Sequence, residues 1–345
     1  MHSCPPILLC EIMIIMQQVL WKCHLYTATV SCYNKIDLPF EENRRNHLSD
    51  SFRNAISKQQ EKNCSILEKG RFTTMKTVCV ITGGGSGMGL AAAKCMPKDK
   101  MIVVTGRTMS KLEKAVKELN DLGYEAYAKT CDTSKRDQVR ELAEYAASLG
   151  EIKNVINSAG LSPAMAEPEK LIRVNALGTV YVNEEFSKLM KAGSVIVDIS
   201  SNSAYILPDF LASKKTFALA DQNEDLFVRK ILGLPNKLKG YQASGLAYGL
   251  SKKFVIWYAA KCAYEYGSKG IRVCSLSPGL IATDMGNLES EEGGSLINTT
   301  AERRMGKPEE LGFAIASVAD ERNGYLAGVD VLVDGGSVVG KKFVK

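Results

Sequence analysis

Hydrophobic and polar positions follow two alternating patterns from residue 75 onward. Short runs rich in apolar residues predict buried strands at 77–82, 101–105, 125–130, 153–157, 194–199, 271–276 and 329–333. Between most of these runs apolar residues recur with helical spacing, for example over 111–122 and 136–149. Apolar strands that alternate with amphipathic helices are typical of a parallel sheet covered on both faces. We therefore expect an α/β fold with a doubly wound, seven-stranded parallel sheet and helices on both faces.

The first 74 residues follow neither pattern. Residues 7–20 form an apolar run of 14 residues, interrupted by one glutamate and two glutamines, which is too short to cross a bilayer. No basic region precedes this run and no clear small-residue cleavage site follows it, unlike in a secretory signal. Residues 34–74 are polar and charged, as in poorly ordered segments. We expect residues 1–74 to be a poorly ordered extension beside a single domain of residues 75–345. The alternatives are a start placed upstream of a natural opening at residue 75, and an extension that binds a membrane surface or a partner.

The composition narrows the chemistry. The formal net charge is +6, from 44 lysines and arginines against 38 aspartates and glutamates, and no block rich in Lys and Arg is present. We therefore expect neither nucleic acid nor a membrane as a partner. All three histidines precede Met75, which excludes a His-containing nucleophilic triad and a His-ligated metal from the rest of the chain, and we expect no metal site. The five cysteines after Met75 form no C-x-x-C pair, and Cys79 and Cys274 lie in apolar runs. We interpret them as buried free thiols in a reducing cytoplasm.

A glycine cluster follows the first predicted strand, within the sequence TGGGSGMG. Gly83, Gly87 and Gly89 have the spacing G-x-x-x-G-x-G, and a helical stretch comes directly after them. Such glycines allow a tight turn, the approach of a pyrophosphate to the backbone, and close packing of a helix whose N-terminus attracts phosphate. The order of strand, loop and helix predicts a dinucleotide site that includes Ser86 and Met88 of the same loop. A tight turn without a ligand is the alternative.

The second predicted strand ends at Thr105, Gly106 and Arg107. Dinucleotide folds that prefer NAD usually have an acidic residue at this end, whereas an arginine there accommodates the 2′-phosphate of NADP. We therefore expect NADP as the preferred cofactor, with NAD as the alternative. A solvated loop charge is the other explanation of Arg107, and Ser86 adds no second cation.

Tyr248 and Lys252 stand four residues apart in the sequence YGLSK, within a helical pattern. This spacing puts both side chains on one face of a helix. A tyrosine is a weak acid or base at neutral pH, but a nearby ammonium group stabilises a phenolate. The pair predicts acid/base chemistry where other site residues join it; alone, it is better explained as a surface pair.

Three further motifs accompany the central predicted strands: NSAG at 157–160, VNALGT at 174–179 and DISS at 198–201. An open α/β sheet binds its ligand at the carboxyl ends of its strands. With T-G-x-x-x-G-x-G and Y-x-x-x-K, these motifs make the chain resemble the short-chain dehydrogenase/reductase family in its compact-chain subgroup. The resemblance runs from about residue 76 to residue 336, includes RMGKPEEL at 304–311 and VDGG at 333–336, and implies a Rossmann fold.

The resemblance implies catalytic roles. Tyr248 would protonate the carbonyl oxygen during reduction or remove the alcohol proton during oxidation. Lys252 would favour the ionised form of that hydroxyl and hold the ribose hydroxyls of the cofactor. Ser201, the second serine of the pair after the fifth strand, would hydrogen-bond the substrate oxygen, with Ser200 and Ser203 as the competing choices.

The same resemblance implies that Asn175 holds a water molecule in a proton relay to Lys252. The remaining cofactor contacts that it implies are Asp132 at the adenine amino group, Asn157, Ala159 and Gly160 along the floor, Pro278 and Gly279 at a turn, and Ile281 with Thr283 at the carboxamide. Hydride would pass directly between the nicotinamide and the substrate carbon, so neither histidine nor metal is needed.

The chain departs from the family pattern mainly at residues 206–244, which we interpret as an insertion beside the active site. Its apolar side chains are Phe210, Leu211, Phe217, Leu226, Phe227, Ile231 and Leu232. They would form either a lid over a bulky substrate or a surface that packs on the body or in a dimer. The insertion resembles that of the bacterial 3-alpha-hydroxysteroid dehydrogenase/carbonyl reductase group, where it covers the surface that other members use to make tetramers and implies a different dimer or a monomer.

Together these features predict an NADP(H)-preferring carbonyl reductase or secondary-alcohol dehydrogenase, with a hydroxysteroid as a candidate substrate. The alternatives are a 3-oxoacyl reductase or sugar-alcohol dehydrogenase and, from another class, a dinucleotide-sensing binding protein. A binding protein has no need of the set Asn175, Ser201, Tyr248 and Lys252. We expect a small-molecule substrate and a homo-oligomer, with a dimer as the simplest case.

Overall fold

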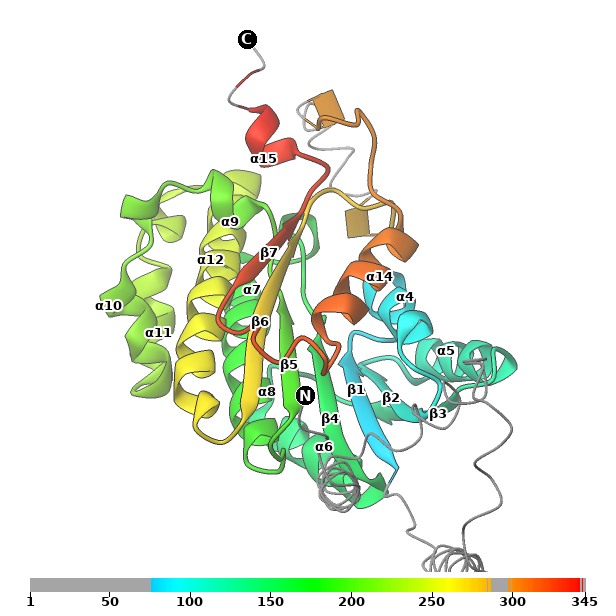
Figure 1. Cartoon of the computed structure of the whole chain (residues 1–345). Coiled ribbons are helices and arrows are strands. Elements are labelled where there is room, and N and C mark those ends of the chain that lie inside the picture. The colour runs from blue at the N-terminus through cyan, green and yellow to red at the C-terminus, as the bar shows by residue number, and fades with distance from the viewer. Residues whose placement is uncertain (1–75, 284, 287–296, 299, 342, 344–345) are drawn as a thin grey trace, which may run out of the picture. The chain divides into compact units, whose positions relative to one another are not determined.

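The computed structural model describes residues 76–283, 285–286, 297–298, 300–341 and 343. The expectation for residues 1–74 lies outside these residues. As predicted, seven parallel strands form one sheet, in the order β3-β2-β1-β4-β5-β6-β7 (Figure 1). The strands are β1 (Thr77–Thr82), β2 (Lys100–Gly106), β3 (Glu125–Thr130), β4 (Glu151–Asn157), β5 (Ser194–Ile199), β6 (Ile271–Pro278) and β7 (Asp330–Val333). β1, β3 and β5 have the predicted bounds, β2 extends one residue further at each end, and β4, β6 and β7 differ by one or two residues at one end.

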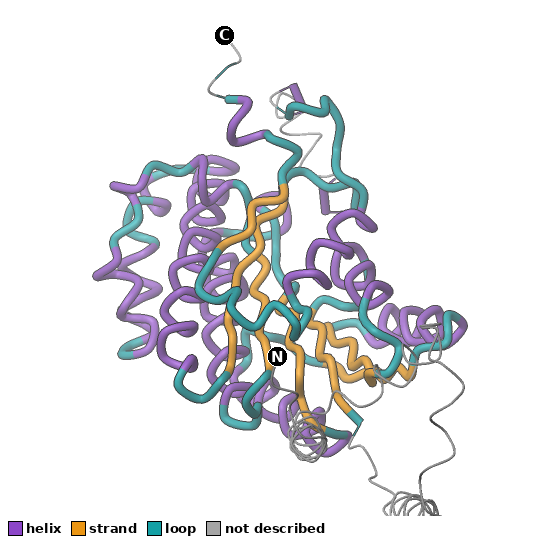
Figure 2. Tube along the Cα trace, in the orientation of Figure 1, coloured by secondary structure: helices purple, strands orange, loops and turns teal. Residues whose placement is uncertain are grey.

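Helices cover the sheet on both faces, so that the strands lie between two helical layers (Figure 2). One layer consists of α4 (Gly87–Cys95), α5 (Met109–Asp121) and α14 (Pro308–Val318). The other consists of α6 (Arg136–Leu149), α8 (Gly178–Ser187) and α12 (Gly240–Gly267). The predicted periodicity explains this arrangement: in α5, for example, Leu112, Ala115 and Leu119 are buried on one face.

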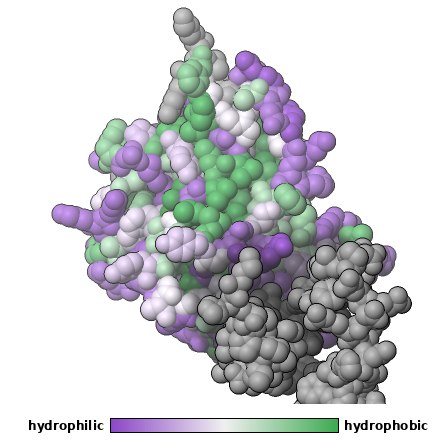
Figure 3. Space-filling model, in the orientation of Figure 1, coloured by the Kyte–Doolittle hydropathy of each residue, from purple (hydrophilic) through white to green (hydrophobic). Residues whose placement is uncertain are grey.

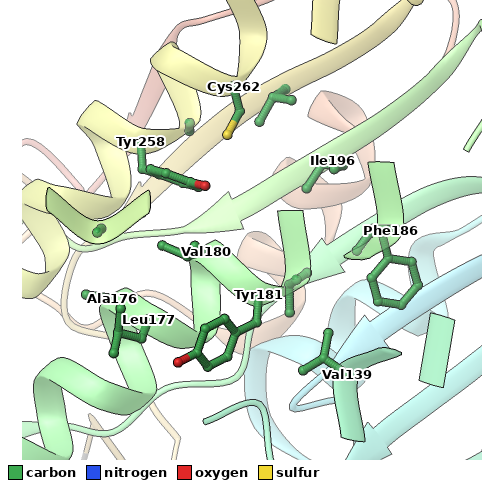
Figure 4. Packing of buried hydrophobic residues seen from close by; sticks show 14 of the residues in the cluster. Val139, Ala176, Leu177, Val180, Tyr181, Phe186, Ile196, Tyr258 and Cys262 are labelled. Atoms are coloured by element: carbon green, nitrogen blue, oxygen red, sulfur yellow. The ribbon is translucent and has the colours of Figure 1, made fainter. Parts of the chain in front are cut away.

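The core beneath α6, α8 and α12 is the larger of the two. Val180 and Phe186 of α8, Ile196 of β5 and Tyr258 of α12 belong to this core (Figure 4), and all four are almost fully buried. Burying one such side chain contributes about 1.5–3 kcal/mol to folding. This core fixes α12, the helix that holds Tyr248 and Lys252, against β5 and β6.

The segment of residues 206–244 is a chain of short helices that precedes and borders α12. Its elements, with α9 at their start, are α9 (Ser203–Ile206), η4 (Asp209–Leu211), α10 (Lys214–Phe217), η5 (Ala218–Asp221), α11 (Glu224–Ile231) and η6 (Pro235–Lys237). The ring of Phe217 stands edge-on to Phe254 of α12 at 5.3 Å between centroids, and Phe227 lies 5.0 Å from the same ring. Ile231 and Leu232 are buried in the same core.

These four apolar side chains of the insertion therefore pack on the body of the domain. The hypothesis that they form a lid over the substrate is wrong for these four side chains, because they are already buried in the core that includes α12. Phe210 differs, since 84% of its surface is exposed. Over the described residues, no helix combines the length and apolar character that crossing a membrane requires.

The remaining elements lie at the carboxyl ends of the strands. They are η2 (Pro163–Met165), α7 (Pro168–Leu171) and η3 (Ile172–Leu177) after β4, and α15 (Ser337–Gly340) after β7. The strand order reverses between β1 and β4, because β2 and β3 extend the sheet on one side and β4 to β7 on the other. A crevice for a ligand is expected at such a point, at the carboxyl ends of β1 and β4.

Candidate active site

The loop between β1 and α4 brings backbone atoms into close contact. Gly83 and Gly87 have positive φ angles of 67° and 56°, which glycine adopts without steric cost. A Cβ on Gly89 would lie 2.5 Å from the carbonyl oxygen of Gly83, and one on Gly83 would lie 3.0 Å from the amide nitrogen of Ala159. Side chains are thus excluded from the turn, and the N-terminus of α4 is left open to a ligand.

A cleft of about 540 Å³ lies beside this loop. It is lined by ten of the residues predicted to contact a cofactor: Gly83, Ser86, Gly87, Met88, Gly89, Arg107, Asp132, Ala159, Gly160 and Thr283. The carboxylate of Asp132 accepts hydrogen bonds from the amide and the hydroxyl of Ser134, at 3.0 Å and 2.7 Å, which hold the loop after β3 in place.

Three cations line the same cleft. Lys94 of α4 forms an ion pair with Glu118 at 2.6 Å. Arg107 follows β2, and Lys111 lies in the first turn of α5. The Cβ of Lys111 would be 3.5 Å from a Cβ on Gly85 of the glycine loop. The sequence reasoning considered only Ser86 as a partner for Arg107 and missed Lys111; a basic residue one turn into the helix after β2 was the signal that could have found it.

A smaller pocket of about 90 Å³ adjoins the cleft. The predicted site residues that line it are Met88, Gly160, Ser201, Tyr248, Lys252, Pro278, Gly279, Ile281 and Thr283. Both spaces share a wall that consists of Met88, Ser158, Gly160, Leu161, Thr283 and Met285. The glycine loop and the Tyr248–Lys252 pair therefore belong to one continuous site.

Tyr248 and Lys252 are held together on α12. The Nζ atom of Lys252 lies 5.7 Å from the centroid of the Tyr248 ring and donates a hydrogen bond of 2.9 Å to the carbonyl oxygen of Ile199. The hydroxyl of Ser200 donates to the carbonyl oxygen of Lys252 at 2.7 Å. Because the lysine side chain is buried, its charge acts in a medium where electrostatic interactions are strong.

Ser201 is the serine of the three that best suits a ligand. It lines the small pocket, and its Oγ atom accepts a hydrogen bond from the amide of Ser203 at 3.2 Å. Its hydroxyl donates only a long hydrogen bond, 3.5 Å, to Oδ1 of Asn202, which a substrate oxygen at a shorter distance would replace. Ser200 also lines the pocket, but its hydroxyl already donates to the backbone of α12. Ser203 is not among the residues that line the pocket.

Asn157 and Asn175 lie beneath the surface of the site, and neither lines the cleft or the small pocket. The side chain of Asn175 accepts from the amide of Leu161 at 2.8 Å and donates to the carbonyl of Leu161 at 2.9 Å and to Ser251 at 3.3 Å. Its side-chain amide thus bonds to protein groups, and the water molecule expected between Asn175 and Lys252 stays a prediction.

Asn157 supports the floor of the cleft rather than forming its surface. Its Oδ1 atom accepts from the hydroxyl of Thr82 at 2.9 Å, and its Nδ2 atom donates to Asp198 at 2.9 Å and to Thr179 at 3.2 Å. Sequence reasoning missed Asp198, although a carboxylate within the apolar run SVIVDI was a visible signal.

The residues present fit a dinucleotide. The cradle at Gly83 and Gly89 has no room for side chains, the cleft is long enough to reach from Asp132 to Thr283, and cations stand where a phosphate would need them. The pocket around Tyr248 joins the cleft at its inner end, where a reacting group would meet both a hydroxyl and the cofactor.

Family models match this chain in two consecutive parts. The model described as short chain dehydrogenase matches residues 77–214, and the model described as Enoyl-(Acyl carrier protein) reductase matches residues 236–338. The unmatched stretch between them falls inside residues 206–244.

Among curated proteins, the short-chain dehydrogenase/reductase bsc3 of Alternaria brassicicola is 30% identical over 268 residues, covering 76% of this chain and 96% of its own. Carbonyl reductase family member 4 of Xenopus laevis is 28% identical over 273 residues, covering 76% and 98%. Among solved structures, a short chain dehydrogenase from Burkholderia cenocepacia in complex with NADP has a TM-score of 0.61 at 20% identity, covering 76% of this chain and 98% of that one.

Proposed function

Because the chain belongs to the short-chain dehydrogenase/reductase family, we propose that it interconverts a ketone and a secondary alcohol with Tyr248 as the acid/base. Members of this family are oxidoreductases that act on CH–OH or carbonyl groups with NAD(P). The observation that carries the proposal is the small pocket that Ser201, Tyr248 and Lys252 line, because it is continuous with the glycine-loop cleft.

The roles follow from the position of each group. In reduction, the hydroxyl of Tyr248 gives its proton to the substrate oxygen, and the hydroxyl of Ser201 donates a hydrogen bond to the same oxygen as negative charge develops there. The buried ammonium of Lys252, 5.7 Å from the Tyr248 ring centroid, stabilises the phenolate that remains. Bound NADP(H) would supply or accept the hydride, held by the glycine loop, Arg107, Asp132 and the Ala159–Gly160 floor.

NADP is the proposed preference over NAD. Arg107 and Lys111 both line the cleft, and two cations without an acidic partner at the end of β2 suit a 2′-phosphate. This is a stronger basis than Arg107 alone, since Lys111 supplies the second cation that Ser86 does not.

An apolar ketone is the proposed substrate class, and a hydroxysteroid or another carbonyl compound of this kind is the candidate that fits. The small pocket is lined by the apolar side chains of Leu161, Ile199, Leu280 and Met285, and by polar side chains besides the catalytic ones, among them Asn202 and Thr300. The four apolar side chains are the basis for preferring an apolar ligand over a polyol. A 3-oxoacyl or sugar substrate remains the alternative to be tested.

We also propose a homodimer that works in a reducing compartment such as the cytoplasm. Cys79, Cys131, Cys262 and Cys274 are buried free thiols, and burial raises the pKa of Cys79 and Cys131 to about 12, so these groups stay protonated and unreactive. The dimer is supported by apolar side chains over the β7 side of the sheet (Figure 3).

The test is turnover by the full chain against steroid ketones, acyl thioesters and sugars, followed by the near-ultraviolet absorbance of NADPH or NADH. Tyr248→Phe should lower kcat by about 10²–10⁴-fold while NADPH binding persists. Tyr264→Phe, at an exposed position of the same helix, is the matched control. Binding of NADPH without turnover of any substrate would favour the dinucleotide-sensing protein instead.

A further inference from the structure

Asp198 is a charged group buried at the centre of the sheet, behind the active site. It lies in β5, has no exposed surface, and pairs in register with Asn157 of β4 and Ser275 of β6. Its carboxylate accepts from Asn157 at 2.9 Å and from Asn183 of α8 at 3.0 Å and 2.9 Å. The reaction as derived above does not use this group, and keeping it buried is costly unless it is held by donors.

The hydrogen bonds of Asn157 continue from Asp198 to the cofactor floor in one direction. Because the Nδ2 atom of Asn157 faces Asp198, its Oδ1 atom faces Thr82 and accepts the hydroxyl proton of Thr82 at 2.9 Å. The oxygen of Thr82 is then left to accept from the amide of Ala159 at 3.0 Å. The orientation of each donor thus depends on the one before it, and the series ends at Ala159 and Gly160, which line the cleft.

A second branch reaches the turn that holds Asn175. Asn183 donates to Asp198 and also to the carbonyl of Thr179 at 3.0 Å. The hydroxyl of Thr179 donates to the carbonyl of Asn175 at 2.9 Å, and the side chain of Asn175 clamps Leu161. Both branches therefore meet the segment from Ala159 to Leu161 from below.

The electrostatic surroundings of Asp198 place its two protonation states close in free energy. Burial raises the pKa of Asp198 to about 7, against the opposing effects of the Asn157 and Asn183 amides and of the charge on Lys252. The other titratable groups that couple to it, among the described residues, are the thiols of Cys262 on α12 and Cys274 on β6. Burial raises the pKa of both thiols, so both are uncharged near neutral pH. The charged group that interacts with Asp198 at that pH is the ammonium of Lys252.

We propose that Asp198 is a positioning residue: its ionised carboxylate orients Asn157 and Asn183 so that the Ala159–Leu161 floor is set for the dinucleotide, and its protonation releases that floor. This inference rests on the proposed function, because it assumes that the floor holds NADP(H). A protonated Asp198 must itself donate a hydrogen bond, yet all three contacts from the amides require it to accept. One amide then has to turn, and the buried Oδ1 atom of Asn183, which has no hydrogen-bond partner, is the acceptor that such a turn would use.

The experiment measures the dissociation constant of NADPH at a series of pH values in the full-length Tyr248→Phe protein, which removes the titration of that tyrosine. The comparison is among this protein, the same protein with Asp198→Asn, and a control with Asp137→Asn, which removes one exposed carboxylate from α6. The phosphate of the ligand titrates equally in all three, so their differences isolate Asp198.

With Asp198 present, the dissociation constant should rise as the pH falls through about 7. With Asp198→Asn it should be about tenfold higher at pH values where the carboxylate is ionised, and this part of its pH dependence should be absent. The reason is that the carboxamide introduced by Asp198→Asn keeps one acceptor oxygen but places an NH₂ group where the second oxygen was. That NH₂ group and the amide of Asn183 are both donors and cannot hydrogen-bond each other.

Equal affinity and equal pH dependence in the Asp198→Asn protein would overturn the inference and leave the proposed function standing. Failure of the wild-type protein to bind either NADPH or NADH would overturn both. If Asp198→Asn does not fold, infrared spectra of the Tyr248→Phe protein decide: a buried carboxylic acid band should appear in step with the loss of affinity. The absence of any such band above about pH 5 contradicts the inference.

Discussion

Arg107 and Lys111 come from different elements but line the same cleft. Arg107 stands after the last residue of β2, and Lys111 reaches the cleft from α5, beside Gly85 of the glycine loop. Among the described residues neither side chain forms an ion pair, whereas Lys94 of α4 pairs with Glu118 and Lys117 of α5 pairs with Asp121. Both charges are therefore available to a phosphate.

We predict that Arg107→Ala and Lys111→Ala each raise the KM for NADPH by about 10–100-fold, because each removes one charge-assisted hydrogen bond to a phosphate. The KM for NADH should change much less. Steady-state kinetics with both cofactors measure this, with Lys114→Ala on the exposed side of α5 as the control. An equal rise in the KM values for NADH and NADPH would show that the two residues do not bind the 2′-phosphate.

For single residues, the sequence predicted correctly which side chains lie at the site, but it predicted less well which groups these side chains contact. Tyr248, Lys252 and Ser201 line one pocket, because motifs at strand ends converge wherever the strands are parallel. Asn157 and Asn175 lie under the floor instead, since the partners of an amide depend on backbone groups that only tertiary structure brings near. Asp198 stands out as a carboxylate within an apolar run, but the sequence does not show that Asn157 and Asn183 are the donors that hold it.

At the scale of elements, hydrogen bonds and packing hold the segment of residues 206–244 against α12 and its neighbours. Arg136 of α6 ties it to the body through hydrogen bonds to Glu184 and Glu185 of α8 and Glu224 of α11. Lys253 of α12 donates to the carbonyl oxygens of Ala204 and Leu207, at 3.0 Å and 2.9 Å. The segment is thus fastened at its start and near its middle.

We predict that Phe217→Ala lowers the free energy of unfolding by about 3–5 kcal/mol, because it leaves a cavity beside Phe254 and Trp257. Phe210→Ala, at a side chain that is 84% exposed, should change it by less than about 0.5 kcal/mol. Urea unfolding followed by circular dichroism measures both. Similar effects of the two substitutions would argue against the packing described for α10.

The strands were predictable because each is a local apolar run, and α5 and α6 because apolar residues recur with helical spacing over three or more turns. The helices of the insertion were not, since α9 and α10 have four residues each, too few for a period to show. The sequence could not show whether their apolar side chains contact a ligand or pack on the domain, because the same apolar residue types suit both environments.

At the scale of the whole domain, the exposed edge of the sheet is the clearest surface for a second copy. β7 lies at the end of the strand order, and its Val331, Leu332 and Val333 are only partly buried. Val329, just before β7, is 39% exposed, and Phe313 of α14 is 70% exposed. Edge strands pair readily with another chain unless charges or a covering element prevent it, and after Asp330 at its start β7 carries only apolar side chains.

We predict that Val329→Glu together with Phe313→Glu converts the proposed dimer into monomers, because each copy would bring two carboxylates into an apolar contact. Light scattering coupled to size-exclusion chromatography measures the mass. Leu122→Glu, at an exposed position after α5 near the opposite end of the sheet, should leave the mass unchanged. A monomeric wild-type protein would dismiss the dimer altogether.

The position of β1 in the middle of the sheet bears on how the chain is made. β1 pairs with β2 on one side, but its other neighbour β4 begins at Glu151, about 70 residues after β1 ends at Thr82. At a synthesis rate of about 5–20 residues per second, one edge of β1 stays open for several seconds on the ribosome. The nascent chain therefore presents the buried sequence TVCVIT as an unpaired apolar edge, the kind of segment that chaperones shield, until translation delivers its partner.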